Sequence, residues 1–213
     1  MQIFIVGGAV RDELPGRPND DRDYVVVGAT LEDLLKQGFR PVGKDFPVFL
    51  HPQTQEEYAL ARTERKSGRG YHGFTFHTAP DVTLEEDLAR RDLTINAMAK
   101  APDGTLIDPF HGQRDLSAKI LRHVGPAFAE DPVRILRAVR QAAAFGFTID
   151  KNTRELMKQA ASQLGNVSIE RLRDEIFKML GGPKASAAIR ALEMLGVFPH
   201  LMPELLKMKG VVQ

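Results

Sequence analysis

The sequence predicts an α/β unit at the N-terminus followed by an all-helical unit. Short β-branched runs alternate with helix-start signals over about the first 120 residues, which is typical of a sheet with helices packed against it. From about Leu121 the apolar residues recur at helical spacing. Of the 213 residues, 43% are hydrophobic and 27% are charged, so the chain can bury a sizeable core.

Composition narrows the class of protein further. The net charge is +1, so nucleic-acid binding would need a local basic surface and cannot be inferred from overall charge. The chain has no cysteine, which excludes disulfides and thiolate metal sites and is compatible with a reducing cytosol. No stretch approaches about 18 consecutive apolar residues, and the N-terminus lacks a signal-peptide pattern. We therefore expect a cytoplasmic protein without a membrane segment.

The first strand is expected over Gln2–Val6, where two glycines end it just before a helix start. Glycines allow backbone N–H groups to approach a phosphate closely, and a helix N-terminus favours anions. Arg11 adds a bidentate phosphate donor. The turn between strand and helix is therefore a candidate phosphate site that includes Gly8.

The second strand is expected over the β-branched run 21–27, and it begins with two carboxylates. Strand side chains alternate between faces, so Asp21 and Asp23 should point the same way. Left alone they would repel each other, whereas Mg²⁺ takes hard oxygen ligands and often shares one or two carboxylates with a substrate phosphate. The pair predicts a divalent-metal clamp, and the alternative is a solvated acidic turn before a strand.

Three further signals complete the first sheet. Thr30-Leu31-Glu32-Asp33 has the form of a capping box and predicts a short helix. Two paired strands are expected at 47–50 and 57–61, with a polar connection between them. The segment from Arg62 to Gly73, rich in glycine and basic residues, is expected to be a mobile surface loop, either a solvated hairpin tip or a lid beside a phosphate-rich site.

A second capping box, Thr83-Leu84-Glu85-Glu86, predicts a helical region that continues through Arg90-Arg91-Asp92 to about Ala99. Adjacent arginines followed by Asp92 and Asn96 are unusual beside an apolar face, which favours a site, although salt bridges on a helix surface are the alternative. A turn at 108–112 is expected to close this first unit.

The helical unit opens with Asp131 as a predicted N-cap and Pro132 at the first helical position. Apolar residues fall on one face of this helix, and Arg134, Arg137 and Arg140 spread over the opposite, exposed side. Further helices are expected over 168–180 and 185–195, with the Gly181-Gly182-Pro183 run between them.

A metal clamp together with several arginines suits a triphosphate, and the reaction class would be nucleotidyl transfer. Cytosine and adenine each present an amino donor beside a ring-nitrogen acceptor, whereas uracil and guanine present a carbonyl acceptor beside an N–H donor. Asp131 next to Arg134 complements the first pattern and leaves unpaired polar groups with the second. The alternative is that Asp131 only caps the helix and Arg134 is a solvated surface residue.

In this order the motifs resemble those of the class II CCA-adding enzymes, the bacterial tRNA nucleotidyltransferases, over their head and neck domains. The motifs are Gly7–Asp12, the Asp21/Asp23 pair, Arg90-Arg91-Asp92 with Asn96, Glu130-Asp131 with Arg134, and Ser168–Arg171. Five spaced motifs in order are highly specific and extend to about residue 180.

The resemblance implies a role for each matching residue. Asp21 and Asp23 would be the catalytic Mg²⁺ ligands, and the segment 62–73 would be the flexible loop linked to the switch from C to A addition. The nucleotide-binding set would be Gly8 and Arg11 at the phosphates, Arg91 and Asp92 with Asn96 at the triphosphate and ribose, Asp131 and Arg134 as the template for CTP and ATP, and Arg137 and Arg140 in the same site.

The resemblance also implies the architecture and the activity. We expect a head of the polymerase-β nucleotidyltransferase type over residues 1–120, a helical neck over 121–181, and the start of an incomplete helical body over 182–213. The expected activity is Mg²⁺-dependent, template-independent addition of CMP and AMP to tRNA 3′ ends, with no membrane and no DNA involved. The alternatives are a poly(A) polymerase, a CC-only or A-only enzyme, or an idle RNA-binding module.

Overall fold

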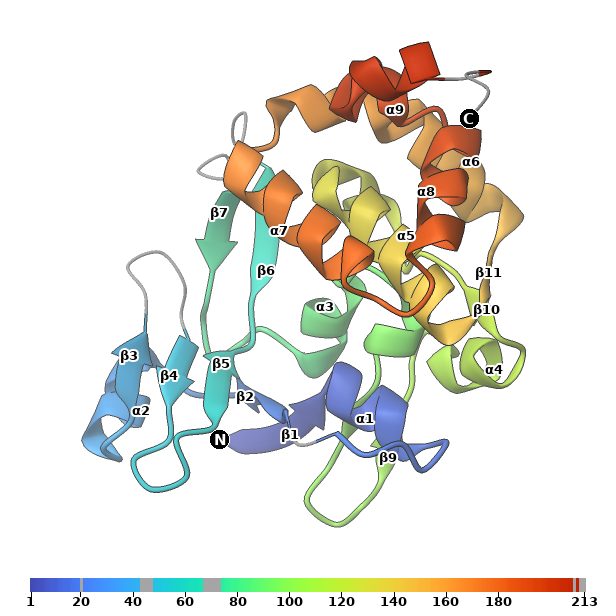
Figure 1. The fold of residues 1–213 in the computed structure, drawn as a ribbon. Coiled ribbons are helices and arrows are strands. Elements are labelled where there is room, and N and C mark those ends of the chain that lie inside the picture. The colour runs from blue at the N-terminus through green and yellow to red at the C-terminus, as the bar shows by residue number, and fades with distance from the viewer. Residues whose placement is uncertain (20, 43–47, 67–73, 209, 211–213) are drawn as a thin grey trace.

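A computed structural model describes the backbone of residues 1–19, 21–42, 48–66, 74–208 and 210, and the side chains of these residues except 64–66 and 74–76. A mixed sheet occupies the lower part of the molecule as drawn, and helices lie above it (Figure 1). The predicted α/β fold followed by helices is confirmed.

The large sheet has seven strands in the order β3-β4-β5-β2-β1-β8-β9. Its strands are β1 Gln2–Val6, β2 Asp23–Val27, β3 Arg40–Val42, β4 Val48–Leu50, β5 Glu57–Leu60, β8 Ala99–Lys100 and β9 Leu106–Ile107. β2 pairs antiparallel with β1 and parallel with β5, so the predicted mixed sheet is confirmed. The expected pairing of 47–50 with 57–61 appears as the antiparallel β4 and β5.

Two helices cover this sheet on opposite faces because alternate side chains of β2 point opposite ways. Val25 packs in a core with Leu88 of α3 (Leu84–Ala89), whereas Val26 packs with Leu34 of α2 (Leu31–Lys36). Both helices begin at the predicted capping boxes, in which the Thr30 and Thr83 hydroxyls each accept from a backbone N–H three residues on.

The region after α3 differs from the predicted helix. α3 ends at Ala89, and the chain continues as a turn, the 3₁₀ helix η2 (Thr94–Asn96) and β8. Every residue from Asp92 to Ala99 is buried, so the segment has no exposed face for a surface helix. Asp92 also accepts a hydrogen bond from the backbone N–H of Leu93, which competes with helix formation.

The segment predicted as a loop from Arg62 to Gly73 begins instead with a strand. β6 Thr63–Lys66 pairs antiparallel with β7 Phe74–His77, and this hairpin rises from the sheet toward α7 in Figure 1. Residues 67–73 lie outside the described residues, so the prediction of a lid there stays a prediction.

The second half is helical and has its own core. Its helices are α4 Gly112–Ser117, η3 Pro126–Glu130, α5 Val133–Phe145, α6 Lys151–Ala160, η4 Ala161–Asn166, α7 Ile169–Leu180, α8 Ala185–Met194, α9 Phe198–Leu201 and η5 Pro203–Met208, and the short strands β10 Ile120–Leu121 and β11 Thr148–Ile149 pair in parallel beside them. α7 and α8 match the predicted helices. α5 starts one residue later than expected, at Val133.

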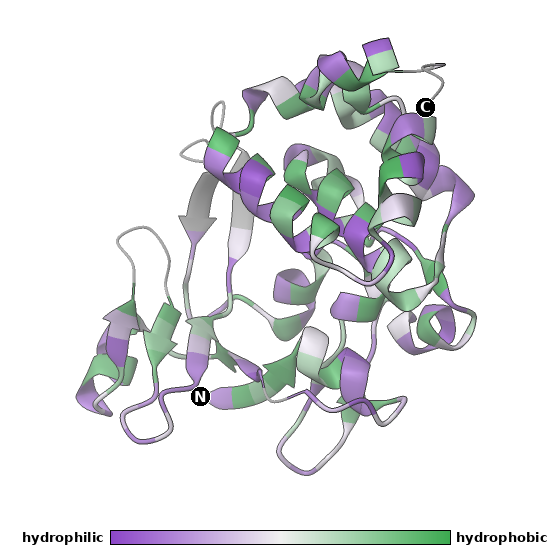
Figure 2. Cartoon of the chain, in the orientation of Figure 1, coloured by the Kyte–Doolittle hydropathy of each residue, from purple (hydrophilic) through white to green (hydrophobic). Residues whose placement is uncertain are grey.

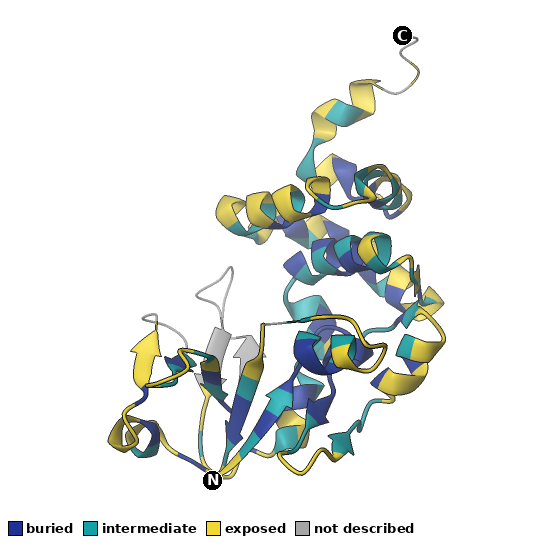
Figure 3. Cartoon of the chain, turned by 60° about the horizontal axis from the view of Figure 1, so that its bottom comes forward, coloured by how far each residue is buried: buried dark blue, intermediate teal, exposed yellow. Residues whose placement is uncertain are grey.

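Amphipathic helices build this second core. Along α5, α7 and α8 hydrophobic and hydrophilic residues alternate (Figure 2), and the apolar ones of α5 pack with Leu121, Met157 and Leu192. Exposed residues prevail toward the C-terminus (Figure 3). Within the described part of the chain, no helix has both the length and the apolar character that crossing a membrane requires.

Candidate active site

A cavity of about 490 Å³ lies where the sheet meets α5 and α7. Its wall contains every predicted site residue except Asp21: Gly8, Arg11, Asp23, Arg91, Asp92, Asn96, Asp131, Arg134, Arg137 and Arg140. It also contains residues to which the sequence analysis assigned no individual role: Gly7, Arg62, Arg90, Gln141, Phe145 and Arg171. The cavity is strongly basic, and its acidic groups are Asp23 on the sheet side, Asp92, and Asp131 on the helical side.

The two carboxylates of the predicted metal clamp do not share a strand. β2 begins at Asp23, and Asp21 lies in the irregular segment before it, so the expectation of one rigid strand for both was wrong. They are nevertheless close enough to interact. Partial desolvation, then the charge of Asp21, raises the pKa of Asp23, and Glu57 on the adjacent β5 acts in the same direction.

These charges fit a hard divalent cation. Burial and the neighbouring carboxylates oppose a negative charge on Asp23, and the Arg91 cation offsets part of this effect by lowering the pKa of Asp23. Among the described residues no group of three or more histidine and carboxylate side chains forms a metal cage. A magnesium-type site does not need one, because Mg²⁺ keeps several waters and completes its shell with substrate phosphates. Asp21 and Asp23 could therefore hold such an ion.

Gly7 leaves room for the Arg91 guanidinium near the Asp23 carboxylate. Its φ of +70° is a left-handed conformation that suits glycine, and a Cβ here would lie 3.1 Å from Arg91 Nη1 and 4.0 Å from Asp23 Oδ2. The turn after β1 thus lets a guanidinium pass close to the backbone beside Asp23. The predicted glycine turn is present, and its first glycine makes room for an arginine.

Asp87 on α3 binds the two adjacent arginines, Arg90 and Arg91. Asp87 is buried, and its carboxylate accepts from Arg90 Nη2 at 2.7 Å and from Arg91 Nη2 at 3.2 Å. Burial alone would raise the pKa of Asp87, but the two arginine charges and their hydrogen bonds outweigh it and lower that pKa. Asp87 therefore stays ionised and fixes both guanidinium groups at the cavity wall.

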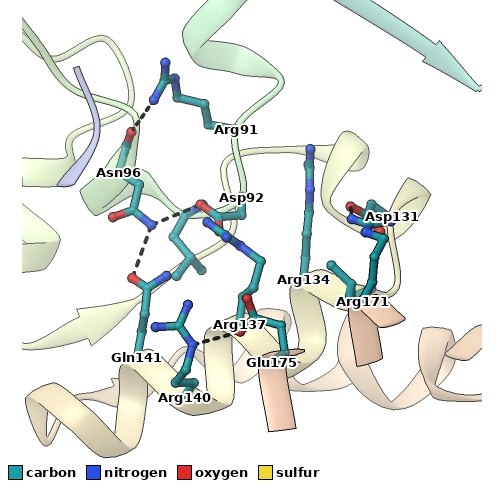
Figure 4. Close-up of polar contacts among 12 residues, drawn as sticks. Arg91, Asp92, Asn96, Asp131, Arg134, Arg137, Arg140, Gln141, Arg171 and Glu175 are labelled. Atoms are coloured by element: carbon teal, nitrogen blue, oxygen red, sulfur yellow. Dashed lines mark hydrogen bonds and ion pairs between the residues drawn. The ribbon is translucent and has the colours of Figure 1, made fainter. Parts of the chain in front are cut away.

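A second network links the sheet to α5 through Asn96 (Figure 4). Arg11 Nη1 donates to Asn96 Oδ1 at 2.8 Å, and Asn96 Nδ2 donates to Asp92 at 3.0 Å and to Gln141 at 3.2 Å. Asp92 in turn accepts from Arg137 Nε at 2.9 Å. Arg11 is also paired with Asp12 at 2.7 Å, so its guanidinium is fixed on several sides.

On the helical side Arg134, Arg137 and Arg140 line the cavity wall. The helix pattern had placed them on its exposed side, but each is partly buried. Asp131, which the sequence analysis placed next to Arg134 as a base template, also binds a residue of α7. Its Oδ2 accepts from Arg171 Nη2 at 2.6 Å, and Arg134 Nη1 donates to the carbonyl of Ala127 at 3.0 Å. The predicted cap role of Asp131 is weak, since its Oδ1 lies 3.4 Å from Val133 N.

Several residues to which the sequence analysis assigned no individual role support predicted ones. Glu175 accepts from Arg140 Nε at 2.8 Å, and the ring of Phe145 lies 4.7 Å below the Arg11 guanidinium. Arg171 and Glu175 are four apart on one helix, a spacing that puts them on one face. That spacing was visible in the sequence, but their partners lie 35 to 40 residues away in the chain.

Comparison with known proteins places this site in context. The family model described as the poly(A) polymerase head domain matches residues 3–122, and the model described as the probable RNA and SrmB-binding site of polymerase A matches residues 146–208. The chain is 64% identical to the multifunctional CCA protein of Dechloromonas aromatica and 58% identical to that of Chromobacterium violaceum, over its full length in both cases.

Solved structures agree with these matches. The CCA-adding enzyme of Bacillus stearothermophilus in complex with CTP has a TM-score of 0.80 and 34% identity over 97% of this chain and 52% of that one. A tRNA nucleotidyltransferase complexed with a primer tRNA and an incoming ATP analog has a TM-score of 0.75 and 34% identity over 94% of this chain and 59% of that one. The chain spans about half the length of the curated relatives it matches, 52% and 53% of those two proteins.

Proposed function

Because the chain belongs to the family of class II CCA-adding enzymes and bacterial poly(A) polymerases, we propose that it carries the nucleotidyltransferase site of an enzyme that adds CMP and AMP to tRNA 3′ ends. The observation that carries the proposal is the convergence, in one basic cavity, of Asp23 from the sheet, the arginines behind it, and Asp131 and Arg134 from the helical half. Phosphate, metal and base would thus be bound by different parts of the chain.

Nucleotidyltransferases of this class generally use a divalent metal, and we propose Mg²⁺ with Asp21 and Asp23 as its protein ligands. When bound, Mg²⁺ would supply positive charge at the reacting phosphate and lower the barrier to attack by the RNA 3′-hydroxyl. The raised pKa of Asp23 supports this role, because a group of carboxylates that is unfavourable on its own becomes favourable around a cation.

The arginines would bind the triphosphate. Arg91 is held by Asp87 and Arg11 by Asp12 and Asn96, so neither guanidinium must be ordered when the ligand arrives. Both lie on the wall of the cavity beside Gly7 and Gly8, where a phosphate can approach the backbone. Preordered donors around developing charge are also what catalysis of phosphoryl chemistry requires.

Asp131 and Arg134 would select the base. Asp131 would accept from the exocyclic amino group of C or A, and Arg134 would donate to the ring nitrogen beside it. With U or G each group would meet a like partner, at about 1–3 kcal/mol for each unpaired polar group. Arg137 and Arg140 share this wall of the cavity, and Asp92 with Asn96 connects it to the phosphate side.

The activity can be tested with purified protein, Mg²⁺ and single labelled nucleoside triphosphates. The RNA substrates are tRNAs that lack all three terminal nucleotides, lack only the terminal adenosine, or are complete. The expected result is CMP incorporation into the first, AMP into the second and none into the third. Long A tails would instead indicate a poly(A) polymerase, and no incorporation would indicate an idle binding module.

We place the reaction, with tRNA as its substrate, in the cytoplasm.

A further inference from the structure

Helix α7 contacts residues of the cavity wall through two side chains that the predicted site did not include. Arg171 and Glu175 lie four residues apart and therefore on one face of the helix. Arg171 binds Asp131, and Glu175 binds Arg140 (Figure 4). Each partner lies on the cavity wall, so one helix supports two groups of the nucleotide site from the side away from the sheet.

The contact with Asp131 is short and partly shielded from water. Arg171 Nη2 and Asp131 Oδ2 are 2.6 Å apart, and the side chains are 29% and 15% exposed. A charge-assisted hydrogen bond of this length is among the stronger ones, and limited exposure reduces its screening by solvent. The contact therefore fixes both the position and the rotation of the carboxylate.

Because Arg171 binds one carboxylate oxygen of Asp131, the other oxygen is the one that can accept a hydrogen bond from a base. Oδ2 is bound by Arg171, while Oδ1 has a long 3.4 Å contact with Val133 N. An ionised carboxylate oxygen has two lone pairs, so Oδ1 keeps the capacity to accept from a base amino group.

We propose that Arg171 is a positioning residue for base selection: it holds Asp131 so that one carboxylate oxygen is directed to the amino group of cytosine or adenine. The inference rests on the proposed function. Glu175 supports it independently, because this buried carboxylate holds Arg140 at 2.8 Å on the same wall. α7 is thereby a second layer behind the base-recognition side of the cavity.

The test measures nucleotide binding to the 213-residue chain by calorimetry, with Mg²⁺ and each of CTP, ATP, UTP and GTP. Arg171→Ala is expected to weaken CTP and ATP binding by about two- to 150-fold, the range for coupled residues in one network, and to change UTP and GTP binding much less. Arg171→Lys should recover part of the preference, because lysine restores the charge without the planar fork.

Arg173→Ala is the matched control. Arg173 is on the same helix, is 56% exposed, and pairs with the neighbouring Asp174 at 3.0 Å, so its loss removes a similar side chain without touching the cavity. It should leave all four affinities unchanged. In an Asp131→Ala background, Arg171→Ala should have no further effect on the preference for C and A, because the group it positions is absent.

The outcomes separate the inference from the function on which it rests. An unmodified chain without a preference for CTP and ATP would overturn the proposed base selection, and this inference with it. A normal preference that persists in Arg171→Ala would overturn the inference alone. Tighter CTP and ATP binding in Arg171→Ala would also overturn it, since Arg171 would then compete with the base for Asp131. Thermal unfolding of each variant separates a loss of preference from a loss of fold.

Discussion

Single residues at this site act mainly by holding other residues. Asp87 fixes Arg90 and Arg91, and Asp12 fixes Arg11, so the phosphate-binding groups are ordered before any ligand is present. The exception is Asp23, whose charge is opposed by its surroundings.

Replacing Asp23 by asparagine should therefore stabilise the protein without metal. The pKa of Asp23 is raised, so the folded state holds the proton more tightly than the unfolded state, and the ionised carboxylate reduces stability as pH rises above the ordinary value of 3.8. At neutral pH without metal, Asp23→Asn should unfold at a higher temperature than the parent. The difference should disappear below that pH, where the carboxyl is protonated in both states.

With Mg²⁺ present, the parent should instead unfold at a higher temperature than Asp23→Asn. The variant should also have lost nucleotidyl transfer. A ligand tenfold above its Kd stabilises the parent by about 1.4 kcal/mol, which corresponds to roughly 3–6 °C in Tm for a protein of this size. Asp23→Asn should gain much less. The exposed Asp81→Asn is the control and should respond to metal like the parent. Equal metal stabilisation of parent and Asp23→Asn would remove Asp23 from the metal site.

At the scale of elements, local signals predicted helix starts well. Both capping boxes are formed by the threonine hydroxyl and the acidic side chain that the sequence indicated. They could be predicted because the interacting groups are three residues apart. The strand β1 and the pairing of β4 with β5 followed in the same way from alternation and turn residues.

Tertiary burial determined the conformation of the segment whose local sequence signals predicted the wrong structure. The stretch after α3 has apolar residues at helical spacing, yet it is covered on all sides and accommodates η2 and a strand. What fixes its conformation is a contact with a distant element, since Thr94 Oγ1 donates to the buried Asp115 of α4 at 2.8 Å. Such a contact cannot be read from spacing within the segment.

Gly112 at the start of α4 allows this contact. A Cβ at residue 112 would lie 2.1 Å from the carbonyl oxygen of Thr94, so one backbone must shift. Gly112→Ala should therefore destabilise the protein by about 1–3 kcal/mol, the usual cost of overpacking, and lower Tm by roughly 2–12 °C. Because η2 carries Asn96, nucleotide binding should weaken as well.

Thermal unfolding and CTP binding would be measured on the same samples. Gly165→Ala is the matched control, because a Cβ at residue 165 meets no described atom within 4 Å. It should leave both Tm and CTP affinity close to the parent values. If Gly112→Ala unfolded like Gly165→Ala, the close packing of α4 against η2 would not be a constraint on the fold.

At the scale of the whole molecule, the cavity lies between the sheet and the helices, so its geometry depends on how these two parts pack together. Leu93 and Ile95 follow the sheet-covering helix in sequence, but they pack in the core of the helical half. Individual motifs could be predicted from the sequence because each is local. The pairing of Asp131 with Arg171 could not, because it depends on how α5 packs against α7.

Asp92 is a charged residue that joins the two halves. It is buried, follows α3, and accepts from Arg137 of α5 at 2.9 Å. Burial by itself would raise the pKa of Asp92, but the charge of Arg137 and the hydrogen bonds from Asn96 and Arg137 outweigh it and lower that pKa. A carboxyl whose pKa is lowered in the folded state stabilises that state above the ordinary value of 3.8, and the stabilisation is lost as pH falls below it.

Asp92→Asn should therefore reduce stability at neutral pH and have little effect in acid. The expected loss is about 1–3 kcal/mol at pH 7, because Arg137 loses a charged partner, which corresponds to roughly 2–12 °C in Tm. Calorimetry across the acid range should show this difference between parent and variant shrinking below pH 3.8. The control Asp174→Asn removes an exposed pair with Arg173 and should change Tm little at any pH.

A difference in Tm between parent and Asp92→Asn that persisted undiminished in acid would show that the variant disturbs packing and not the ion pair. An unchanged Tm at pH 7 would mean that Asp92 does not hold the two halves together.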